Sequence, residues 1–339
     1  MDQIYSSWKM LKHLEQVKNF LGGNGYPVCL QIDLTNRCNY SCLHCSEMLT
    51  EDYLAFRNAD LDFEALKKFL SENGNDDLKS IQFTGGGEPT IHPQFAEIAA
   101  FTRSNFEMGL VTNGSRLHDA KILNSIVGSH WIRISVDAAT KEMYERIHDC
   151  SCREVFERMP ETVVRIKSLS PNTILGFSFV ITNLNFREIV PATKFAKQNG
   201  FDNLRFSGDI SAEGTRINSE LLEQIHRDLA EAKKLEDGNF KIFLMKERTS
   251  DAFFQDRPSI CYYAMVVGVI AATGEMYLCC QRKNHSNSRI GSIYKKTLAE
   301  IYRDQEPIRV EECVPCWMDA KNHLIEYYYR EDPLHANFP

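Results

Sequence analysis

The chain has 339 residues, of which 43% are hydrophobic and 25% are charged. These proportions are ordinary for a globular protein with a substantial core, and they exclude a disordered chain. With 39 basic and 46 acidic residues, the net charge is −7. This balance disfavours a general nucleic-acid binder, because neutralising phosphates needs clustered Lys and Arg.

Neither a membrane span nor a secretion signal is expected. The longest apolar run, residues 264–272, is much shorter than the roughly 20 residues of a membrane-spanning helix. The N-terminus lacks a basic segment followed by an apolar one, which is the signature of a signal peptide. We therefore expect a cytoplasmic protein with no membrane partner and no nucleic-acid partner.

The first 25 residues predict an amphipathic helical lead-in, because apolar residues recur there at helical spacing before several glycines. Strands and helices then alternate. Strands are predicted at residues 28–34, 80–84, 108–112, 131–136, 173–181 and 204–207. Helices are predicted at residues 63–70, 93–102, 117–127 and 186–198, with two more beginning near residues 141 and 153. Six such units predict an α/β fold with a parallel sheet, either open or curved into a partial barrel, with active residues at the carboxyl ends of the strands.

The pattern changes after about residue 215. Residues 219–234 predict a charged helix, and residues 266–278 predict a β-hairpin that turns at Gly274. Two further helices are predicted at residues 297–303 and 317–330. We expect three parts, namely a lead-in at 1–25, an α/β domain at 26–215 and a C-terminal domain at 216–339.

The eleven cysteines point to metal binding or catalysis. Their number is odd and the chain is long, which argues against a disulfide scaffold. Cys38, Cys42 and Cys45 follow the first predicted strand, with three and two residues between them. Three thiolates on one loop can hold a metal centre and leave one position open, as in an iron–sulfur cube with a free iron. Zinc with a distant fourth ligand, or three unligated loop thiols, are the alternatives.

A glycine-rich segment, Thr84 to Thr90 (TGGGEPT), ends the second predicted strand. Adjacent glycines let a ligand approach the backbone closely. The segment is not a dinucleotide-binding fingerprint, because Thr90 stands where the third glycine belongs, and no Lys-Ser/Thr pair follows as in a phosphate-binding P-loop. A plain tight turn is the alternative.

Together, the CxxxCxxC run and the GGEP run after the next strand resemble the radical S-adenosylmethionine (SAM) superfamily. The resemblance implies that Cys38, Cys42 and Cys45 hold a 4Fe–4S cluster whose open iron binds SAM. In that family, an electron from the cluster cleaves SAM to methionine and a 5′-deoxyadenosyl radical, which abstracts hydrogen from the substrate. The resemblance also implies a partial (β/α)6 TIM-like barrel and an electron donor such as flavodoxin or ferredoxin.

The resemblance further implies which residues lie near SAM. His44 would lie beside the adenine, and the segments that end the third and fourth strands would lie near the cofactor. The implied cofactor-binding residues are His44, Gly86, Gly87, Glu88, Thr112, Asn113 and Ser135, with Gly86, Gly87 and Glu88 at the SAM ammonium. Asp137 and Arg205 are the candidate catalytic residues. Arg205 could bind a carboxylate, although a surface ion pair is the alternative.

The C-terminal part contains a second cysteine set, Cys261, Cys279, Cys313 and Cys316. Four thiols of this kind could hold zinc or an iron–sulfur cluster. The pattern resembles the SPASM/twitch extension of radical SAM enzymes, and no cysteine follows Cys316, which implies the shorter twitch form with one auxiliary 4Fe–4S cluster. Four cysteine ligands would leave no open iron, so we expect this cluster to carry an electron. Cys280 competes with Cys279 for the ligand position.

Three other cysteines are expected outside both sets. Cys29, in the first strand, is expected to be buried. Cys150 and Cys152 could donate a hydrogen atom, although free buried thiols are usually inert.

The cysteine layout also bears on the substrate. The cysteine layout resembles that of 2-deoxy-scyllo-inosamine dehydrogenase, which implies oxidation of a small polar metabolite such as an amino sugar, a cyclitol or a nucleotide-linked sugar. Candidate bases or cations are Arg205, Asp137, Arg282 and His285. About 26 residues precede the first strand, too few for an independent peptide-recognition domain. A peptide maturase or epimerase, a sugar-acid decarboxylase and a non-catalytic metal or electron-transfer protein remain as alternatives.

Overall fold

A computed structural model gives the fold, and it describes residues 6–49, 53–74, 77–150, 154–209, 216–245, 257–283, 285–303, 305–313, 316 and 318–329. A single ten-stranded sheet organises this part of the chain, in the order β10-β9-β8-β1-β2-β3-β4-β5-β6-β7. The strands are β1 (Cys29–Asp33), β2 (Ser80–Thr84), β3 (Glu107–Thr112), β4 (Trp131–Ser135), β5 (Ile174–Ile181), β6 (Asn203–Gly208), β7 (Lys241–Met245), β8 (Val267–Ile270), β9 (Glu275–Tyr277) and β10 (Arg289–Ser292).

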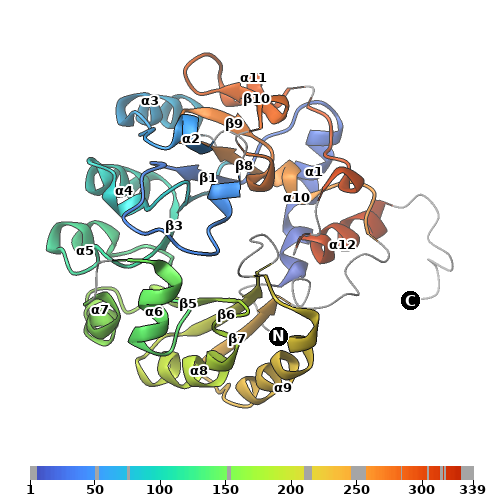
Figure 1. Ribbon diagram of the computed structural model, residues 1–339. Coiled ribbons are helices and arrows are strands. Elements are labelled where there is room, and N and C mark those ends of the chain that lie inside the picture. The colour runs from blue at the N-terminus through green and yellow to red at the C-terminus, as the bar shows by residue number, and fades with distance from the viewer. Residues whose placement is uncertain are drawn as a thin grey trace.

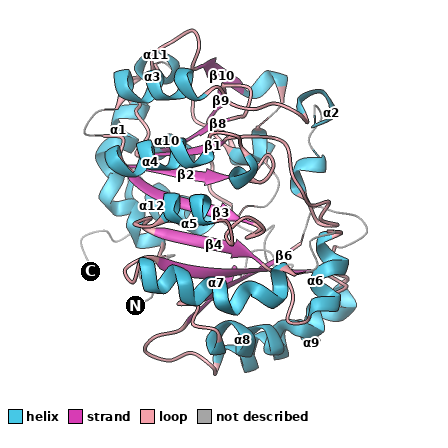
Figure 2. Cartoon of the chain, turned by 90° about the vertical axis from the view of Figure 1, so that its left-hand side faces the viewer, coloured by secondary structure: helices cyan, strands magenta, loops and turns pink. Residues whose placement is uncertain are grey.

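Helices cover the outer side of the curved sheet (Figure 1), and in the turned view helices α4, α5 and α7 lie over the strands (Figure 2). The helices are α1 (Leu14–Leu21), α2 (Tyr53–Phe56), α3 (Phe63–Asn73), α4 (Phe95–Asn105), α5 (Ala120–Ile126), α6 (Lys141–His148), α7 (Val155–Leu169), α8 (Ile189–Gln198), α9 (Leu222–Lys233), α10 (Tyr263–Val266), α11 (Leu298–Tyr302) and α12 (Asp319–Tyr329). Side-chain caps fix several helix starts. Asp62, for example, accepts a hydrogen bond from the Ala65 N–H at 2.7 Å and begins α3.

The strand order decides between the two predicted architectures. Strands β1 to β7 lie in sequence order and every neighbouring pair is parallel. A doubly wound sheet would reverse its strand order near the middle, whereas a barrel continues around in one direction. The fold is therefore the expected partial barrel.

The two faces of the sheet differ in chemistry. Partnered residues share a face, and alternate residues of a strand point to opposite faces. The row that contains Ile32, Phe83 and Leu110 is buried against the helices. The opposite, inner face carries many polar side chains, namely Gln31, Asp33, Gln82, Arg133, Ser135, Ser178, Arg205 and Ser207. Because a barrel interior that only packs is filled by bulky apolar residues, this polar face is suited to binding a ligand.

The C-terminal part extends the same sheet. The six strands predicted between residues 28 and 207 are confirmed, but two were missed: β7, which pairs in parallel with β6, and β10, which pairs with β9. The predicted hairpin is confirmed as β8 and β9, and β8 pairs in parallel with β1. The boundary at residue 215 stays a prediction, and strand pairing runs across it.

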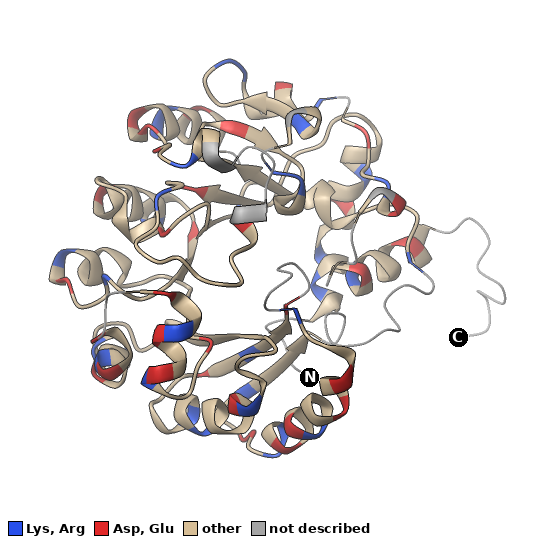
Figure 3. Cartoon of the chain, in the orientation of Figure 1, with Lys and Arg blue, Asp and Glu red and all other residues tan. Residues whose placement is uncertain are grey.

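The lead-in begins as a 3₁₀ helix, Ser7–His13, and continues as α1. It packs against α12 and α10 on the open side of the barrel (Figure 1). Acidic and basic residues are intermixed along the outer helices (Figure 3). Within the described ranges, no helix has both the length and the apolar composition needed to cross a bilayer.

Candidate active site

The loop that carries Cys38, Cys42 and Cys45, called the cysteine loop here, follows β1. Backbone hydrogen bonds fix it on two sides. On one side, the Thr35 carbonyl accepts from Gly87 at 2.8 Å and the Arg37 carbonyl accepts from Glu88 at 2.9 Å. On the other side, the loop N–H groups of residues 41 and 43 donate to carbonyls at the end of α6, at 3.1 and 2.9 Å. The loop is therefore held between the glycine-rich segment and α6.

Cys38 is exposed on this loop, whereas Cys42 and Cys45 are half-buried. Although Cys38 is exposed as a residue, its thiol is largely shielded from water, which raises the pKa of Cys38 to about 11, and burial raises the pKa of Cys42 further. A thiolate at these positions is thus costly unless a cation compensates its charge. Thiolates are the soft ligands that iron–sulfur clusters use, so the three thiols suit such a group.

Gly86 and Gly87 are required by packing against the cysteine loop. A Cβ atom on Gly86 would lie 1.9 Å from Asn36 Oδ1, and one on Gly87 would lie 1.8 Å from the Arg37 carbonyl oxygen. Both distances are far shorter than a contact between non-bonded atoms. The two segments approach this closely only because neither glycine has a side chain.

Glu88 is buried and joins the ends of β2 and β3. Its carboxylate accepts hydrogen bonds from Thr90 N (3.1 Å), Thr90 Oγ1 (2.6 Å), Thr112 Oγ1 (2.6 Å) and Asn113 N (2.7 Å). Burial raises the pKa of Glu88, and the four donors oppose that shift. Asn113 also donates to Asn39 Oδ1 at 2.9 Å and so reaches the cysteine loop. Both Glu88 oxygens already hold the chain, an arrangement that the resemblance, with Glu88 at an ammonium, did not anticipate.

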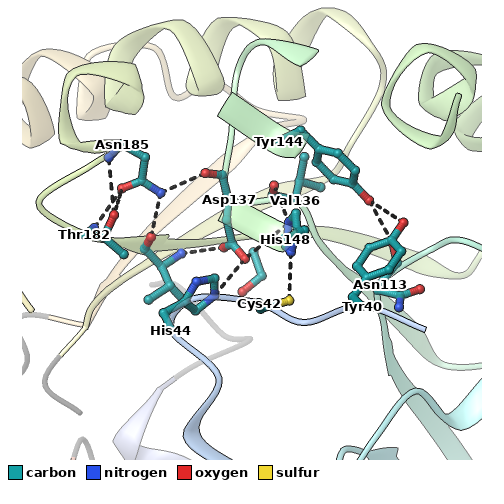
Figure 4. A network of polar contacts seen from close by, with 12 residues as sticks. Tyr40, Cys42, His44, Asn113, Val136, Asp137, Tyr144, His148, Thr182 and Asn185 are labelled. Carbon is teal, nitrogen blue, oxygen red and sulfur yellow. Dashed lines mark hydrogen bonds and ion pairs between the residues drawn. The ribbon is translucent and has the colours of Figure 1, made fainter. Parts of the chain in front are cut away.

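His44 is bound by Asp137 at the end of β4 (Figure 4). His44 Nε2 lies 3.2 Å from Asp137 Oδ2, and Asp137 Oδ1 accepts from Val180 N at 2.6 Å. Burial lowers the pKa of His44, but the hydrogen bond and charge of Asp137 outweigh it and raise that pKa. Asp137 has a φ of 56°, a left-handed conformation that costs free energy in a non-glycine residue. With both oxygens engaged, Asp137 is arranged to position His44.

His148 supports Cys42 from α6 (Figure 4). Its Nε2–H donates to the Val136 carbonyl at 2.9 Å, so in the neutral ring Nδ1 accepts from the Cys42 thiol at 3.1 Å. Burial lowers the pKa of His148, which favours this neutral form. Sequence reasoning missed His148, because its only signal was a histidine in the last turn of a predicted helix.

Ser135 and Arg205 lie on the inner face, joined through Ser178. Ser178 on β5 is the register partner of both Ser135 on β4 and Arg205 on β6. Arg205 Nη2 lies 3.4 Å from Ser178 Oγ. Arg205 thus faces the barrel interior next to the residues that end β4.

The C-terminal cysteines line a cavity of about 390 Å³. Its lining includes Cys261, Cys279, Cys313 and Cys316, together with the basic side chains Arg257, Arg282 and His285. Cys280 does not contribute to the lining. Arg282 and His285, which were predicted to lie near the substrate, therefore line the cavity of the C-terminal cysteines.

The two cysteine sets differ from a preformed single-ion site. Among the described residues, no three His, Cys, Asp or Glu side chains converge closely enough to hold one metal ion. A zinc ion needs its ligands around one centre, whereas a cube distributes its thiolates over separate irons. The four thiols that line the cavity are ligands that either group can use.

The cavity predicts which neighbouring cysteine is a ligand. Replacing Cys279 with alanine is expected to remove about four irons from the reconstituted protein, because a four-ligand cube loses one of its anchors. Replacing Cys280 with alanine should leave the iron content unchanged. Iron and sulfide analysis of both variants tests this, and the opposite ranking would make Cys280 the ligand.

Of the remaining cysteines, Cys29 and Cys150 are half-buried as residues, and Cys152 lies outside the described residues. Burial of the thiol raises the pKa of Cys29 to about 11. Asp33, Glu47 and Lys283 form a buried ionic cluster beside the cysteine loop, and no sequence motif points to them.

The cysteine loop and the glycine-rich segment are bonded to each other at the carboxyl ends of the barrel strands, which is where enzymes with barrel folds carry their active sites. The model of the Radical SAM superfamily matches residues 32–203, which is half of the chain. The chain belongs to the radical SAM superfamily, and it is therefore an enzyme that binds SAM and a 4Fe–4S cluster.

Three curated relatives illustrate the range of the superfamily. A tungsten-containing aldehyde ferredoxin oxidoreductase cofactor-modifying protein of Pyrococcus furiosus is 24% identical over 56% of this chain and 53% of its own. A GTP 3′,8-cyclase of Campylobacter jejuni subsp. doylei is 27% identical over 50% of this chain and 52% of its own. The mycofactocin maturase MftC of Mycobacterium ulcerans is 24% identical over 78% of this chain and 71% of its own. The chain thus spans about half the length of the first two relatives.

Two solved structures share the fold over most of the chain. Streptococcus suis SuiB bound to its precursor peptide SuiA aligns with a TM-score of 0.65 and 13% identity, over 90% of this chain and 71% of SuiB. The protein anSMEcpe with bound AdoMet aligns with a TM-score of 0.61 and 19% identity, over 88% of this chain and 82% of anSMEcpe. At these identities the likeness concerns the fold alone.

Proposed function

We propose that this enzyme oxidises a polar substrate by hydrogen abstraction and passes an electron to an auxiliary 4Fe–4S cluster in its C-terminal part. The observation that carries the proposal is the cavity lined by Cys261, Cys279, Cys313 and Cys316. Four thiolates leave no iron open for a substrate, so electron transfer is the chemistry that such a cluster supplies. Oxidation of an alcohol to a ketone balances when a hydrogen atom leaves to the deoxyadenosyl radical, a proton leaves to a base and an electron leaves to the auxiliary cluster.

The contacts described above suggest a role for each residue of the first site, which is the site around Cys38, Cys42 and Cys45. Cys38, Cys42 and Cys45 are proposed to hold the SAM-binding cluster, which when present supplies the electron that cleaves SAM. His44 Nδ1 is buried without a hydrogen-bond partner among the described residues, so it is available to the SAM adenine. Gly86 and Gly87 keep the cysteine loop in place, while Glu88, Thr112 and Asn113 fix the strand ends around it.

The polar inner face supports a polar substrate. Ser135, Ser178 and Arg205 form a row across three strands, where hydroxyl groups and a guanidinium can bind a hydroxylated or carboxylated molecule. We propose a small metabolite such as an amino sugar, a cyclitol or a nucleotide-linked sugar. Arg205 remains the candidate catalytic residue, and Asp137 is proposed as a positioning residue that acts through His44.

A reducing cytoplasm suits both cysteine sites, because their thiols must stay unoxidised before metal binding. A flavodoxin or ferredoxin is the proposed electron donor, since cleavage of SAM consumes an electron.

Modification of a peptide is the second candidate. The mycofactocin maturase matches this chain over 78% of its length, a longer match than the cyclase gives. Supplying a peptide instead of a metabolite and measuring which one raises the rate of SAM cleavage distinguishes the two candidates.

Anaerobic reconstitution tests the proposed function. The protein with iron, sulfide, SAM and dithionite is expected to contain about eight irons and to form 5′-deoxyadenosine, because two cubes hold four irons each. About four irons with 5′-deoxyadenosine would remove the auxiliary cluster and the electron transfer assigned to it. Zinc in the C-terminal cavity would do the same.

A further inference from the structure

A buried lysine from the C-terminal part lies among the motifs of the first site. The Lys283 side chain is 3% exposed, and Lys283 follows Cys279 by four residues. Its ammonium donates to Asp33 Oδ2, to Glu47 Oε1 at 2.9 Å and to the Gly85 carbonyl at 3.0 Å. An ammonium has three donors, so this geometry uses all of them.

The three acceptors come from three separate parts of the first site. Asp33 is the last residue of β1, Glu47 follows Cys45 by two residues, and Gly85 begins the glycine run. These acceptors lie between 198 and 250 residues from Lys283 in the sequence. One side chain thus connects the start of the cysteine loop, its end and the glycine segment.

The two carboxylates of this cluster keep the buried lysine charged. Burial lowers the pKa of Lys283, but the carboxylates of Asp33 and Glu47 outweigh burial and raise that pKa. Lys283 is therefore charged at neutral pH, and each acceptor gains a charge-assisted hydrogen bond. A buried charge with three matched acceptors fixes geometry more firmly than an exposed ion pair does.

We propose that Lys283 is a positioning residue of the SAM site: it fixes the cysteine loop and the glycine segment relative to each other, and it makes their geometry depend on the C-terminal part that carries Cys279. The proposal rests on the proposed function, because SAM binding is one of its readouts. Asp33 adds a second feature to the cluster. Lys283 binds the Oδ2 atom of Asp33, whereas the Oδ1 atom is buried and has no hydrogen-bond partner among the described residues. By fixing Asp33, Lys283 therefore also fixes the position of this acceptor at the carboxyl end of β1.

Lys283→Met removes the ammonium and keeps an apolar stem. Its SAM affinity is expected to fall about tenfold or more, as when an outer partner of a metal site is lost, while the iron content stays that of the unsubstituted protein. Hydrogen exchange should become faster in residues 33–47 and 85–91 together, because Lys283 joins both segments. Lys295→Met is the matched control, since Lys295 is an exposed lysine of the same C-terminal part.

The double variant Asp33→Asn with Lys283→Met separates positioning from charge compensation. Lys283→Met leaves the carboxylates of Asp33 and Glu47 without their cation, and Asp33→Asn removes the more deeply buried of these two charges. The double variant should regain thermal stability relative to Lys283→Met without regaining SAM affinity. Lys283→Arg, which keeps a cation and several donors, should retain more SAM affinity than Lys283→Met.

Two results would overturn the proposal. One is unchanged SAM affinity and unchanged exchange in Lys283→Met. The other is recovery of SAM affinity together with stability in the double variant, which would make Lys283 only a charge partner. If the unsubstituted protein neither binds SAM nor forms 5′-deoxyadenosine, the proposed function fails, and hydrogen exchange alone decides whether Lys283 holds the two segments.

Discussion

Replacing Cys42 with serine is expected to abolish 5′-deoxyadenosine formation and to leave about four of about eight irons bound. A serine oxygen is a hard ligand that holds cluster iron poorly compared with a thiolate. The same result is expected for serine at Cys38 and at Cys45. Iron, sulfide and 5′-deoxyadenosine are measured on protein reconstituted without oxygen.

Folding should be nearly unaffected, which separates the chemistry from stability. A serine hydroxyl can keep the hydrogen bond that the Cys42 thiol makes with His148 at 3.1 Å. The free energy of unfolding of the cluster-free protein should therefore change by about 1 kcal/mol or less.

Cys150→Ser is the matched control. Cys150 is half-buried, and its charge contributes to the raised pKa of Cys42, so the two thiols lie near each other. This variant should keep all irons and full 5′-deoxyadenosine formation. Retention of about eight irons in Cys42→Ser with loss of irons in Cys150→Ser would exchange the roles of the two cysteines.

The parts of the site that end parallel strands were predictable from the sequence. The carboxyl ends of parallel strands meet at one edge, and the segments after β1, β2, β3 and β4 are the ones that carry Cys38, Glu88, Asn113 and Asp137. The sequence alone indicates all four of these residues. What the sequence did not reveal is how these segments are joined.

Glu88 illustrates this limit. The motif resemblance directs attention to a ligand, whereas the carboxylate binds Thr90, Thr112 and Asn113 within the protein. Hydrogen bonds between strand ends depend on the register of β2 against β3, which no local pattern specifies.

Lys283 and the missed strands have a related cause. Lys283 stands in a polar segment, Gln-Arg-Lys-Asn-His, that is typical of an exposed loop, and its burial depends on partners far away in the sequence. β7 is a run of five residues without strict alternation, and β10 contains Arg, Gly and Ser. Both strands form because an edge of the sheet is available for pairing, so tertiary context outweighs local propensity.

The second large effect is expected for Glu88→Gln. The amide retains one acceptor oxygen and replaces the other with an NH2 group, while the surrounding four groups all donate. If the amide oxygen faces Thr90 and Thr112, the NH2 group faces the Asn113 N–H and leaves that buried donor without an acceptor. A buried unsatisfied donor and the loss of charge-assisted bonds cost together about 2–4 kcal/mol of unfolding free energy. Denaturant unfolding of the cluster-free protein measures this cost.

Glu97→Gln is the matched control, because Glu97 is 48% exposed and pairs with Lys121 at 2.9 Å on the outer surface. An exposed pair of this kind contributes about 0–1 kcal/mol, so the control should unfold almost like the unsubstituted protein.

SAM affinity decides what Glu88 does. If Glu88→Gln loses both stability and SAM affinity, the carboxylate acts by holding the ends of β2 and β3 around the cysteine loop, as its four hydrogen bonds indicate. Loss of SAM affinity with stability equal to that of the control would instead make Glu88 a direct ligand of the SAM ammonium, as the family resemblance implies. Unchanged stability together with unchanged affinity would contradict both roles, and the buried carboxylate would then contribute neither to the fold nor to SAM binding.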